Sequence, residues 1–164
     1  ERCALRTMIR ERRALRAPAS GAVDMKSLLV PVDGSPNADR ALAHAVKMAR
    51  AVQGMKIILL NVQEQLERWY PHGLASDSSR EHLKQLGQTQ SASARRLLEE
   101  SGCPYEFLIM FGRTAETIVQ VARDHGCSGI VMGTRGLSDL ENVFLGSTSF
   151  KVVHLSEVPV TLVK

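Results

Sequence analysis

Residues 129–136 read GIVMGTRG, and after nine further residues the chain continues with GSTS at 146–149. The short apolar run at 129–132 predicts a buried strand, and the hydroxyl-rich segment predicts the start of a helix. Glycines at the end of a strand let backbone N–H groups approach a ligand with no Cβ in the way. A helix N-terminus adds free N–H groups and a partial positive charge. The spacing G-x-x-G-x9-G-S therefore predicts an anion site suited to phosphate groups.

The three glycines of this pattern also have a plainer interpretation. Turn glycines are common, so Gly133, Gly136 or Gly146 taken alone is more typical of a turn than of a ligand site. The full set, followed by the hydroxyls of 147–149, favours ligand binding, with backbone φ above zero expected at Gly136 and Gly146. Arg135 lies inside the loop, and two interpretations stay open for it: a phosphate contact or a solvated side chain.

The chain alternates strand-like and helix-like segments from residue 25 onward. The apolar runs predict strands at 27–32, 56–62, 105–111, 129–132 and 158–163. Helical spacing predicts helices from 36 to about 53, from 78 to about 102, over 114–125 and over 147–155. Apolar strands joined by helices imply an α/β fold with a parallel sheet covered on both faces. In such sheets ligands bind outside the carboxyl ends of the strands, where the strand order reverses.

The first predicted strand ends in VPVDGS, so Asp33 lies at a carboxyl strand end just before a helix. A carboxylate in that place can accept hydrogen bonds from ribose hydroxyls or from a base amine. The alternative is that Asp33 only caps the first helix, which is a common use of Asp. Taken with the glycine pattern, the strand-end position favours a ligand contact.

Size and composition describe one ordinary domain with an unusual arm. The chain has 164 residues and a net charge of +4, of which residues 1–24 carry +3 and residues 25–164 only +1. The domain at 25–164 is therefore nearly neutral, and no basic face points to nucleic acid. No run of about 18 apolar residues is present, which excludes a transmembrane helix. Because Met25 directly precedes the first strand, we expect the arm at 1–24 to be flexible or foreign to the native protein.

Other residues offer little chemistry. Cys3, Cys103 and Cys127 form no C-x-x-C pair and no zinc pattern, which indicates a reducing, cytoplasmic setting. Trp69–His72 in the polar loop at 63–77 is either a lid over a base, a partner contact or an anchor for a long loop. Neither a G-x-S-x-G elbow nor a P-loop pattern is present. No catalytic residue or metal ligand is assigned, and at most slow hydrolysis is expected.

These segments resemble the universal stress protein family over nearly all of residues 25–164. The resemblance covers LVPVDGS at 29–35, LLNV at 59–62 and GRTAETI at 112–118. It continues with VMGTRG at 131–136, LGSTS at 145–149 and VPVTLV at 158–163. The spaced glycines match the version that marks the ATP-binding branch of the family.

The resemblance implies an open, Rossmann-like parallel sheet of five strands in the order 3-2-1-4-5. The strand order then reverses between the strands that hold Asp33 and Gly133. It also implies ATP as cofactor, with Mg²⁺ held through the phosphates. Asp33 would contact the ribose, and Pro31 and Val62 would line the adenine. The candidate nucleotide-binding residues are Pro31, Val32, Asp33, Val62, Met132, Gly133, Arg135, Gly136, Gly146, Ser147, Thr148 and Ser149.

Three functions of different classes follow from the sequence. The leading hypothesis is an ATP-binding module in a stress response or signalling, the second is a slow ATPase that uses the same pocket, and the third is a nucleotide-free interaction protein. The last strand, Val158–Val163, is apolar and unguarded by charge until Lys164, so an exposed edge would favour pairing with a second copy. The resemblance likewise implies a homodimer through this strand.

Overall fold

The computed structural model describes residues 9–12, 27–64, 77–135 and 145–164. Its centre is a sheet in the order β1-β4-β3-β2-β5-β6. Five of these strands are parallel: β2 (Ser27–Pro31), β3 (Lys56–Gln63), β4 (Tyr105–Phe111), β5 (Gly129–Gly133) and β6 (Val160–Val163). Numbered from β2 as the first, they follow the order 3-2-1-4-5, which confirms the predicted open parallel sheet.

A sixth strand, β1 (Ile9–Arg12), comes from the N-terminal arm and pairs antiparallel with β4. The sequence IRER has a single apolar residue and no strand pattern, so nothing in it predicts this element. The edge of β4 offers unpaired backbone groups to any extended segment, whatever its side chains. The expectation that the arm as a whole is flexible or foreign stays a prediction.

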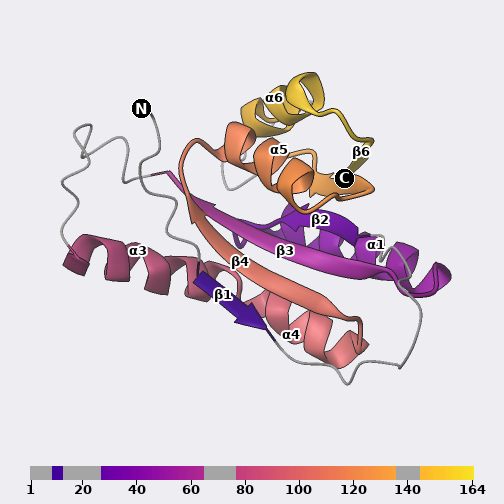
Figure 1. Cartoon of the computed structure of the whole chain (residues 1–164), viewed down its shortest axis with the longest axis horizontal. Helices are drawn as coiled ribbons and strands as arrows, with labels where there is room; N and C mark the ends of the chain where they lie inside the picture. The colour runs from indigo at the N-terminus through magenta and orange to yellow at the C-terminus, as the bar shows by residue number, and fades with distance from the viewer. Residues whose placement is uncertain (1–8, 13–26, 65–76, 136–144) are drawn as a thin grey trace.

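Five described helices cover the sheet. They are α1 (Pro36–Ala51), α3 (Asp77–Gln90), α4 (Ala92–Ser101), α5 (Thr114–Asp124) and α6 (Ser147–Leu155). In Figure 1, α5 and α6 lie on one side of the sheet and α3 and α4 on the other. Buried residues of α1 and α4 share one hydrophobic cluster, and those of α5 and α6 share a second.

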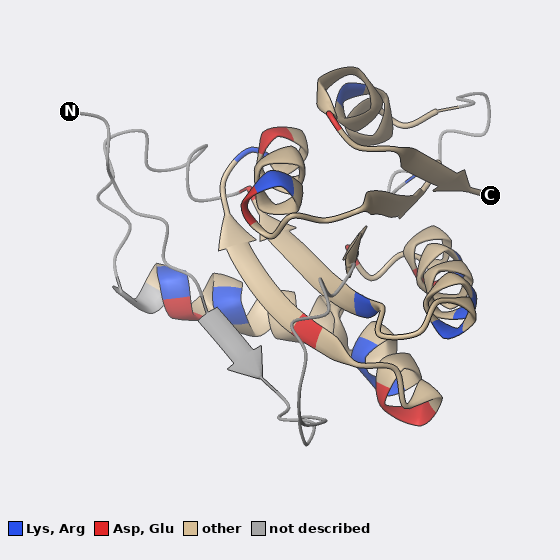
Figure 2. Ribbon diagram, turned by 45° about the vertical axis from the view of Figure 1, so that its right-hand side comes forward, with Lys and Arg blue, Asp and Glu red and all other residues tan. Residues whose placement is uncertain are grey.

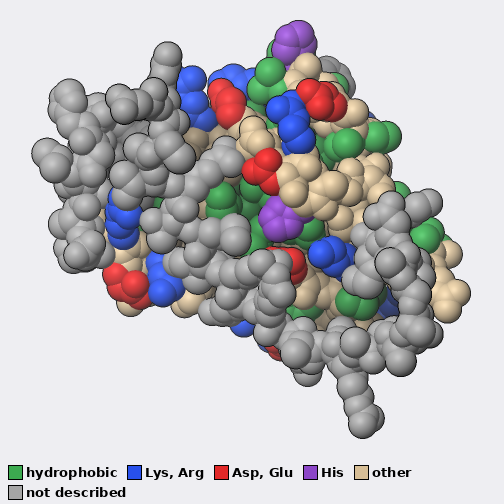
Figure 3. Space-filling view, in the orientation of Figure 1, with side chains coloured by type: hydrophobic (Ala, Val, Ile, Leu, Met, Phe, Trp, Pro, Cys, Tyr) green, Lys and Arg blue, Asp and Glu red, His purple; other side chains and the backbone are tan. Residues whose placement is uncertain are grey.

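The strands divide their side chains between these two clusters. Leu28 and Val30 of β2 belong to the α1–α4 cluster, and Leu29 belongs to the α5–α6 cluster. The alternation follows from the period of two in a strand. Because both faces are covered, the strands are mainly apolar, and charged residues colour mainly the helices in Figure 2. On the face seen in Figure 3, blue and red side chains of the described residues are interspersed.

The two cysteines in the described ranges, Cys103 and Cys127, are free and buried, as small residues filling helix–strand connections would be. Burial raises the pKa of the Cys127 thiol, and the hydrogen bond from Ser27 opposes that rise only in part. A thiol of this kind packs as a small apolar side chain.

The predicted single helix from 78 to about 102 is wrong in one respect. It is broken at Ser91, between α3 and α4, and ends where Gly102 adopts φ 69° as a left-handed C-cap. Ser favours caps over helix interiors because its hydroxyl competes for backbone hydrogen bonds. The backbone of Gln90, the last residue of α3, also packs closely on the loop after β2, and the break allows this approach.

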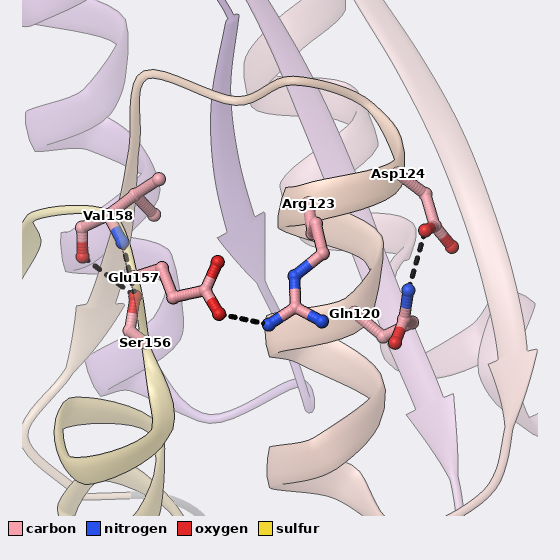
Figure 4. A network of polar contacts seen from close by, with 6 residues as sticks. All are labelled: Gln120, Arg123, Asp124, Ser156, Glu157 and Val158. Carbon is pink, nitrogen blue, oxygen red and sulfur yellow. Dashed lines mark hydrogen bonds and ion pairs between the residues drawn. The ribbon is translucent and has the colours of Figure 1, made fainter.

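The last strand is shorter than predicted, since β6 begins at Val160 and not at Val158. Pro159 has no N–H to donate, although its carbonyl accepts the N–H of Ile130 at 2.9 Å. Before it, the Ser156 hydroxyl donates to the Val158 carbonyl and accepts the Val158 N–H (Figure 4). The Arg123–Glu157 ion pair ties this turn to α5.

Within the described ranges, the structure contains no helix that is both long enough and apolar enough to cross a lipid bilayer.

Candidate functional site

A cavity of about 350 Å³ opens at the carboxyl ends of β2 and β5, on either side of the point where the strand order reverses. Neighbouring strands in this sheet run β3-β2-β5, so the chain leaves β2 and β5 toward different helices and leaves a crevice between them. The cavity lies within the size range of small-molecule sites. Its lining combines an apolar wall with a rim of hydroxyl and glycine residues.

The structure brings the predicted site residues together around this cavity. All of them line it except Gly136, which lies outside the described residues, as does the Trp69–His72 segment. Four lining residues were missed: Ala38, Leu60, Thr114 and Ile118. Nothing in the sequence separates Leu60 and Ile118 from core residues, because an apolar pattern is the same whether a strand or helix end faces solid core or a cavity.

The N-terminus of α6 offers open backbone donors at the rim of the cavity. Its N-cap, Gly146, has no side chain, and its own N–H is bound by the Thr134 carbonyl at 2.7 Å. The first intrahelical bond then runs from Phe150 N–H to the Gly146 carbonyl at 2.9 Å. The N–H groups of residues 147–149 therefore have no carbonyl partner within the helix, as at any uncapped start.

The two other helices that begin at the cavity are already occupied by side chains of the protein. In α1, the Ser35 hydroxyl caps the helix by accepting the Ala38 N–H at 3.2 Å. In α5, the Glu64 carboxylate accepts the N–H of Thr114 at 2.6 Å. Since a side chain already satisfies donors at α1 and α5, the start of α6 is the described helix end at this cavity best able to take an anion.

Gly133 and Gly146 differ in what the absence of a side chain does for the structure. A Cβ on Gly133 would lie 2.9 Å from Cβ of Asn37, so this glycine lets the end of β5 approach the start of α1. Gly146 has φ −66° and ψ 153°, an extended conformation open to any residue. The expectation of φ above zero at Gly146 is therefore wrong; what the absent side chain leaves is space at the mouth of α6.

Ser149 ties the two halves of the motif together. It is 3% exposed, and its hydroxyl donates to the carbonyl of Gly133 at 2.9 Å. Its single O–H donor is thus used inside the protein, unlike the exposed Ser147 and the half-buried Thr148. Ser149 holds the start of α6 against the end of β5, and Ser147 and Thr148 present their hydroxyls at the rim.

Asp33 does not serve as the N-cap of α1, because that cap is Ser35. One carboxylate oxygen, Oδ1, accepts the Ser35 N–H at 3.0 Å, which holds the side chain in a tight local turn. The residue is half-buried and lines the same cavity as the motif. Among the described lining residues, Asp33 and Arg135 are the ionisable ones, and the described residues contain no cluster of His, Cys, Asp or Glu that could hold a metal ion.

The model of the universal stress protein family matches residues 25–164. The chain belongs to the universal stress protein family. A universal stress protein of Thermus aquaticus is 36% identical over 140 residues, which cover 85% of this chain and 98% of that protein. The match begins at Met25, so the arm lies outside the part that defines the family.

Solved structures of universal stress proteins share the fold. The structure of MJ0577 from Methanocaldococcus jannaschii is 28% identical, with a TM-score of 0.73 over 87% of this chain and 97% of that one. A universal stress protein in complex with cAMP is 23% identical, with a TM-score of 0.66 over 85% of this chain and 97% of that one. At that identity the second likeness establishes the fold alone.

Proposed function

We propose that this universal stress protein binds ATP in the cavity between β2 and β5 and acts as a nucleotide-dependent module in a stress response or in signalling. The observation that carries the proposal is the uncapped start of α6, which lines the same cavity as the carboxylate of Asp33. An anion site and a ribose acceptor on opposite rims of one crevice are the two polar ends that a nucleotide needs.

The lining gives the nucleotide a direction. The triphosphate lies at the backbone N–H groups of residues 147–149 and at the hydroxyls of Ser147 and Thr148. The ribose lies at Asp33, and the base lies against the apolar residues Pro31 and Val62. The missed residues Leu60, Thr114 and Ile118 extend that wall. The opposite direction is disfavoured because the Glu64 carboxylate at the start of α5 would repel phosphates.

Adenine as the base and Mg²⁺ as the counterion are parts of the proposal. A universal stress protein of the same fold forms a complex with cAMP, which carries adenine. The described lining has a single carboxylate, so Mg²⁺ would enter with the phosphates and keep waters in most of its coordination positions. Arg135 lines the same cavity and lies within the glycine motif, between Gly133 and Gly136, so we assign it a phosphate contact.

We also propose a homodimer through β6 in a cytoplasmic setting. β6 lies at the edge of the sheet, and Leu162 on it is 37% exposed. A two-fold partner that places the same strand antiparallel would cover both edges. The buried free thiols of Cys103 and Cys127 suit a reducing compartment.

The test of the proposed ligand is to purify the protein without added nucleotide, denature it and identify what is released. The expected result is a stoichiometric adenine nucleotide, identified by chromatography and mass. Protein that releases none and gives no thermal stabilisation with added ATP would support the nucleotide-free interaction protein instead. The ratio of ATP to ADP in the released fraction bears on the slow ATPase alternative.

A further inference from the structure

A network of three side-chain amides, two of them buried and the third half-buried, lies beneath the loop that carries Asp33. Asn61 and Gln63, both on β3, are 1% and 4% exposed. Gln63 Nε2 donates to Asn61 Oδ1 at 2.6 Å and to Oε1 of Gln90 at 2.8 Å. Asn61 Nδ2 lies 3.3 Å from the same oxygen of Gln90. The cavity lining includes none of the three, so the proposed nucleotide site does not use them directly.

Asn61 also anchors the backbone of residues 32–34, the ligand loop, to β3. Its Nδ2 donates to the carbonyl of Val32 at 2.9 Å. Because β2 ends at Pro31, Val32 lies past the last paired residue of the strand, while its N–H still reaches the Leu60 carbonyl at 2.8 Å. Both backbone groups of Val32 are therefore fixed to β3, one residue before Asp33.

The same network contacts the break between α3 and α4. Gly34 adopts φ 85°, and a Cβ there would lie 3.1 Å from the Gln90 carbonyl oxygen. On α3, a Cβ at Gly87 would lie 2.8 Å from Asn61 Oδ1. The absence of a side chain at Gly34 and Gly87 thus allows close contact of this junction with the ligand loop and with the network. Ser91, at the break, has a buried hydroxyl with no hydrogen-bond partner among the described residues.

Three amides in this place need a reason, because apolar side chains would avoid their desolvation. Burying a polar group costs free energy even when it is paired, and a connected polar network fixes one geometry more strictly than packing does. The neighbouring inward residues of the strands, Ile57, Leu59 and Ile109, are apolar. The geometry that the network fixes is the position of the Val32–Gly34 backbone relative to β3 and α3.

We propose that Asn61 is a positioning residue for nucleotide binding and that the Asn61–Gln63–Gln90 network couples the cavity to the α3–α4 junction. Asn61 holds the loop so that Asp33 meets the ribose. Occupancy of the cavity restrains the same loop and, through Gly34 and Gln90, the junction. The binding part of this inference rests on the proposed function, whereas the anchoring of the loop does not.

The test compares two truncations of neighbouring buried amides. Asn61→Ala removes the donor to Val32, and Gln63→Ala removes a buried amide from the same network but leaves that donor in place. Without nucleotide, Asn61→Ala should speed amide hydrogen exchange at residues 33–35 about tenfold, as expected for one lost hydrogen bond. It should weaken ATP binding by a similar factor. Gln63→Ala should change both by less than about threefold.

The outcomes separate the positioning role of Asn61 from the proposed binding of ATP. Equal effects of the two truncations on the loop and on ATP affinity would overturn the positioning role. Faster loop exchange in Asn61→Ala, with no ATP binding by the wild type, would support the anchor and refute the proposed function. Asn61→Leu, which is close to Asn in size and has no donor for Val32, replaces Asn61→Ala if the latter fails to fold.

The coupling is tested in the wild type without any substitution. Binding of ATP should slow amide exchange at residues 87–91 as well as at 33–35, although residues 87–91 do not line the cavity. Slowed exchange at 33–35 alone would overturn the coupling to the α3–α4 junction and leave Asn61 as an anchor only.

Discussion

At the scale of single residues, Asp33 is held by the same short turn from which it would bind ribose. Its Oδ1 accepts the Ser35 N–H, and Ser35 in turn caps α1. The carboxylate is thereby fixed at the rim before any ligand arrives. Such preorganisation reduces the entropy that binding would otherwise have to offset.

Replacing Asp33 by Asn separates these two roles. Asn keeps an oxygen for the Ser35 N–H, so the loop should stay folded, but it loses the charge and one acceptor for ribose hydroxyls. We expect the Kd for ATP to rise about tenfold, in line with the loss of one charged hydrogen bond. The Kd for 2′,3′-dideoxy-ATP should change much less. An equal rise for both nucleotides in calorimetry would show that Asp33 does not contact the ribose.

The residue scale also shows what a sequence can and cannot reveal about a site. Asp33, Ser147 and Thr148 could be predicted as lining residues, because each is a polar residue at a strand end or helix start close to the glycine pattern or to the strand end that faces it in the predicted sheet. Leu60 and Ile118 could not be predicted as lining residues, because the sequence does not distinguish an apolar residue that borders the core from one that borders a cavity. The packing reason for a glycine at position 133 could not be predicted either, since its contact with Asn37 joins positions far apart in the chain.

At the scale of elements, the site depends on how α6 is fixed to the end of β5. The Ser149 hydroxyl bonds the Gly133 carbonyl, and the Gly146 N–H bonds the Thr134 carbonyl. These contacts orient the open N–H groups toward the cavity without using them. The element that would hold the phosphates is thus braced by bonds on its inner side.

Ser149→Ala should destabilise the fold by about 1–2 kcal/mol, because it leaves the Gly133 carbonyl buried without its side-chain partner. The free energy of unfolding from urea titration measures this loss. Ser147→Ala, which removes an exposed hydroxyl in the same turn, should change stability by less than about 0.5 kcal/mol. Equal stability of both variants and the wild type would contradict the bracing role of Ser149.

The boundaries of helices and strands could be predicted where a local sequence signal sets them. They could not be predicted where a contact with a distant part of the chain sets them. The Pro36 start of α1 and the Gly102 end of α4 are both local, and both are where the pattern places them. The break at Ser91 accompanies a contact of Gln90 with Gly34, more than fifty positions away. The pairing of β1 with β4 depends on an open sheet edge and not on the sequence of β1.

At the scale of the whole molecule, the sheet has one edge covered by β1 and one formed by β6. Val160→Lys on β6 would place a charge at the proposed contact between two copies, where its desolvation is unfavourable. We expect light scattering to give a dimer mass for the wild type at micromolar concentration and a monomer mass for the variant. A thermal melt checks that the variant is folded. A wild-type monomer would refute the homodimer.

The described lining offers no obvious general base beyond Asp33, which we assign to the ribose and whose Oδ1 already accepts the Ser35 N–H. We therefore expect ATP turnover far below the roughly 10 per second that is typical of dedicated enzymes. Steady-state release of phosphate measures it. A rate that approaches that value and is lost in a variant of one cavity residue would show that a catalytic group has been missed.

Calorimetry of Mg-ATP binding to the wild type and to Gly146→Val tests directly whether the cavity is an ATP site. The extended backbone of Gly146 can accept Val, so the variant should fold, but its side chain would stand at the start of α6, where the phosphates are proposed to bind. Lys151→Val, which introduces the same side chain at an exposed position of α6 outside the cavity, is the control. We predict binding by the wild type and the control, and affinity at least about tenfold lower in Gly146→Val, equivalent to about 1.4 kcal/mol. The absence of binding heat in the wild type, or unchanged affinity in Gly146→Val, would contradict the assignment of the cavity as an ATP site.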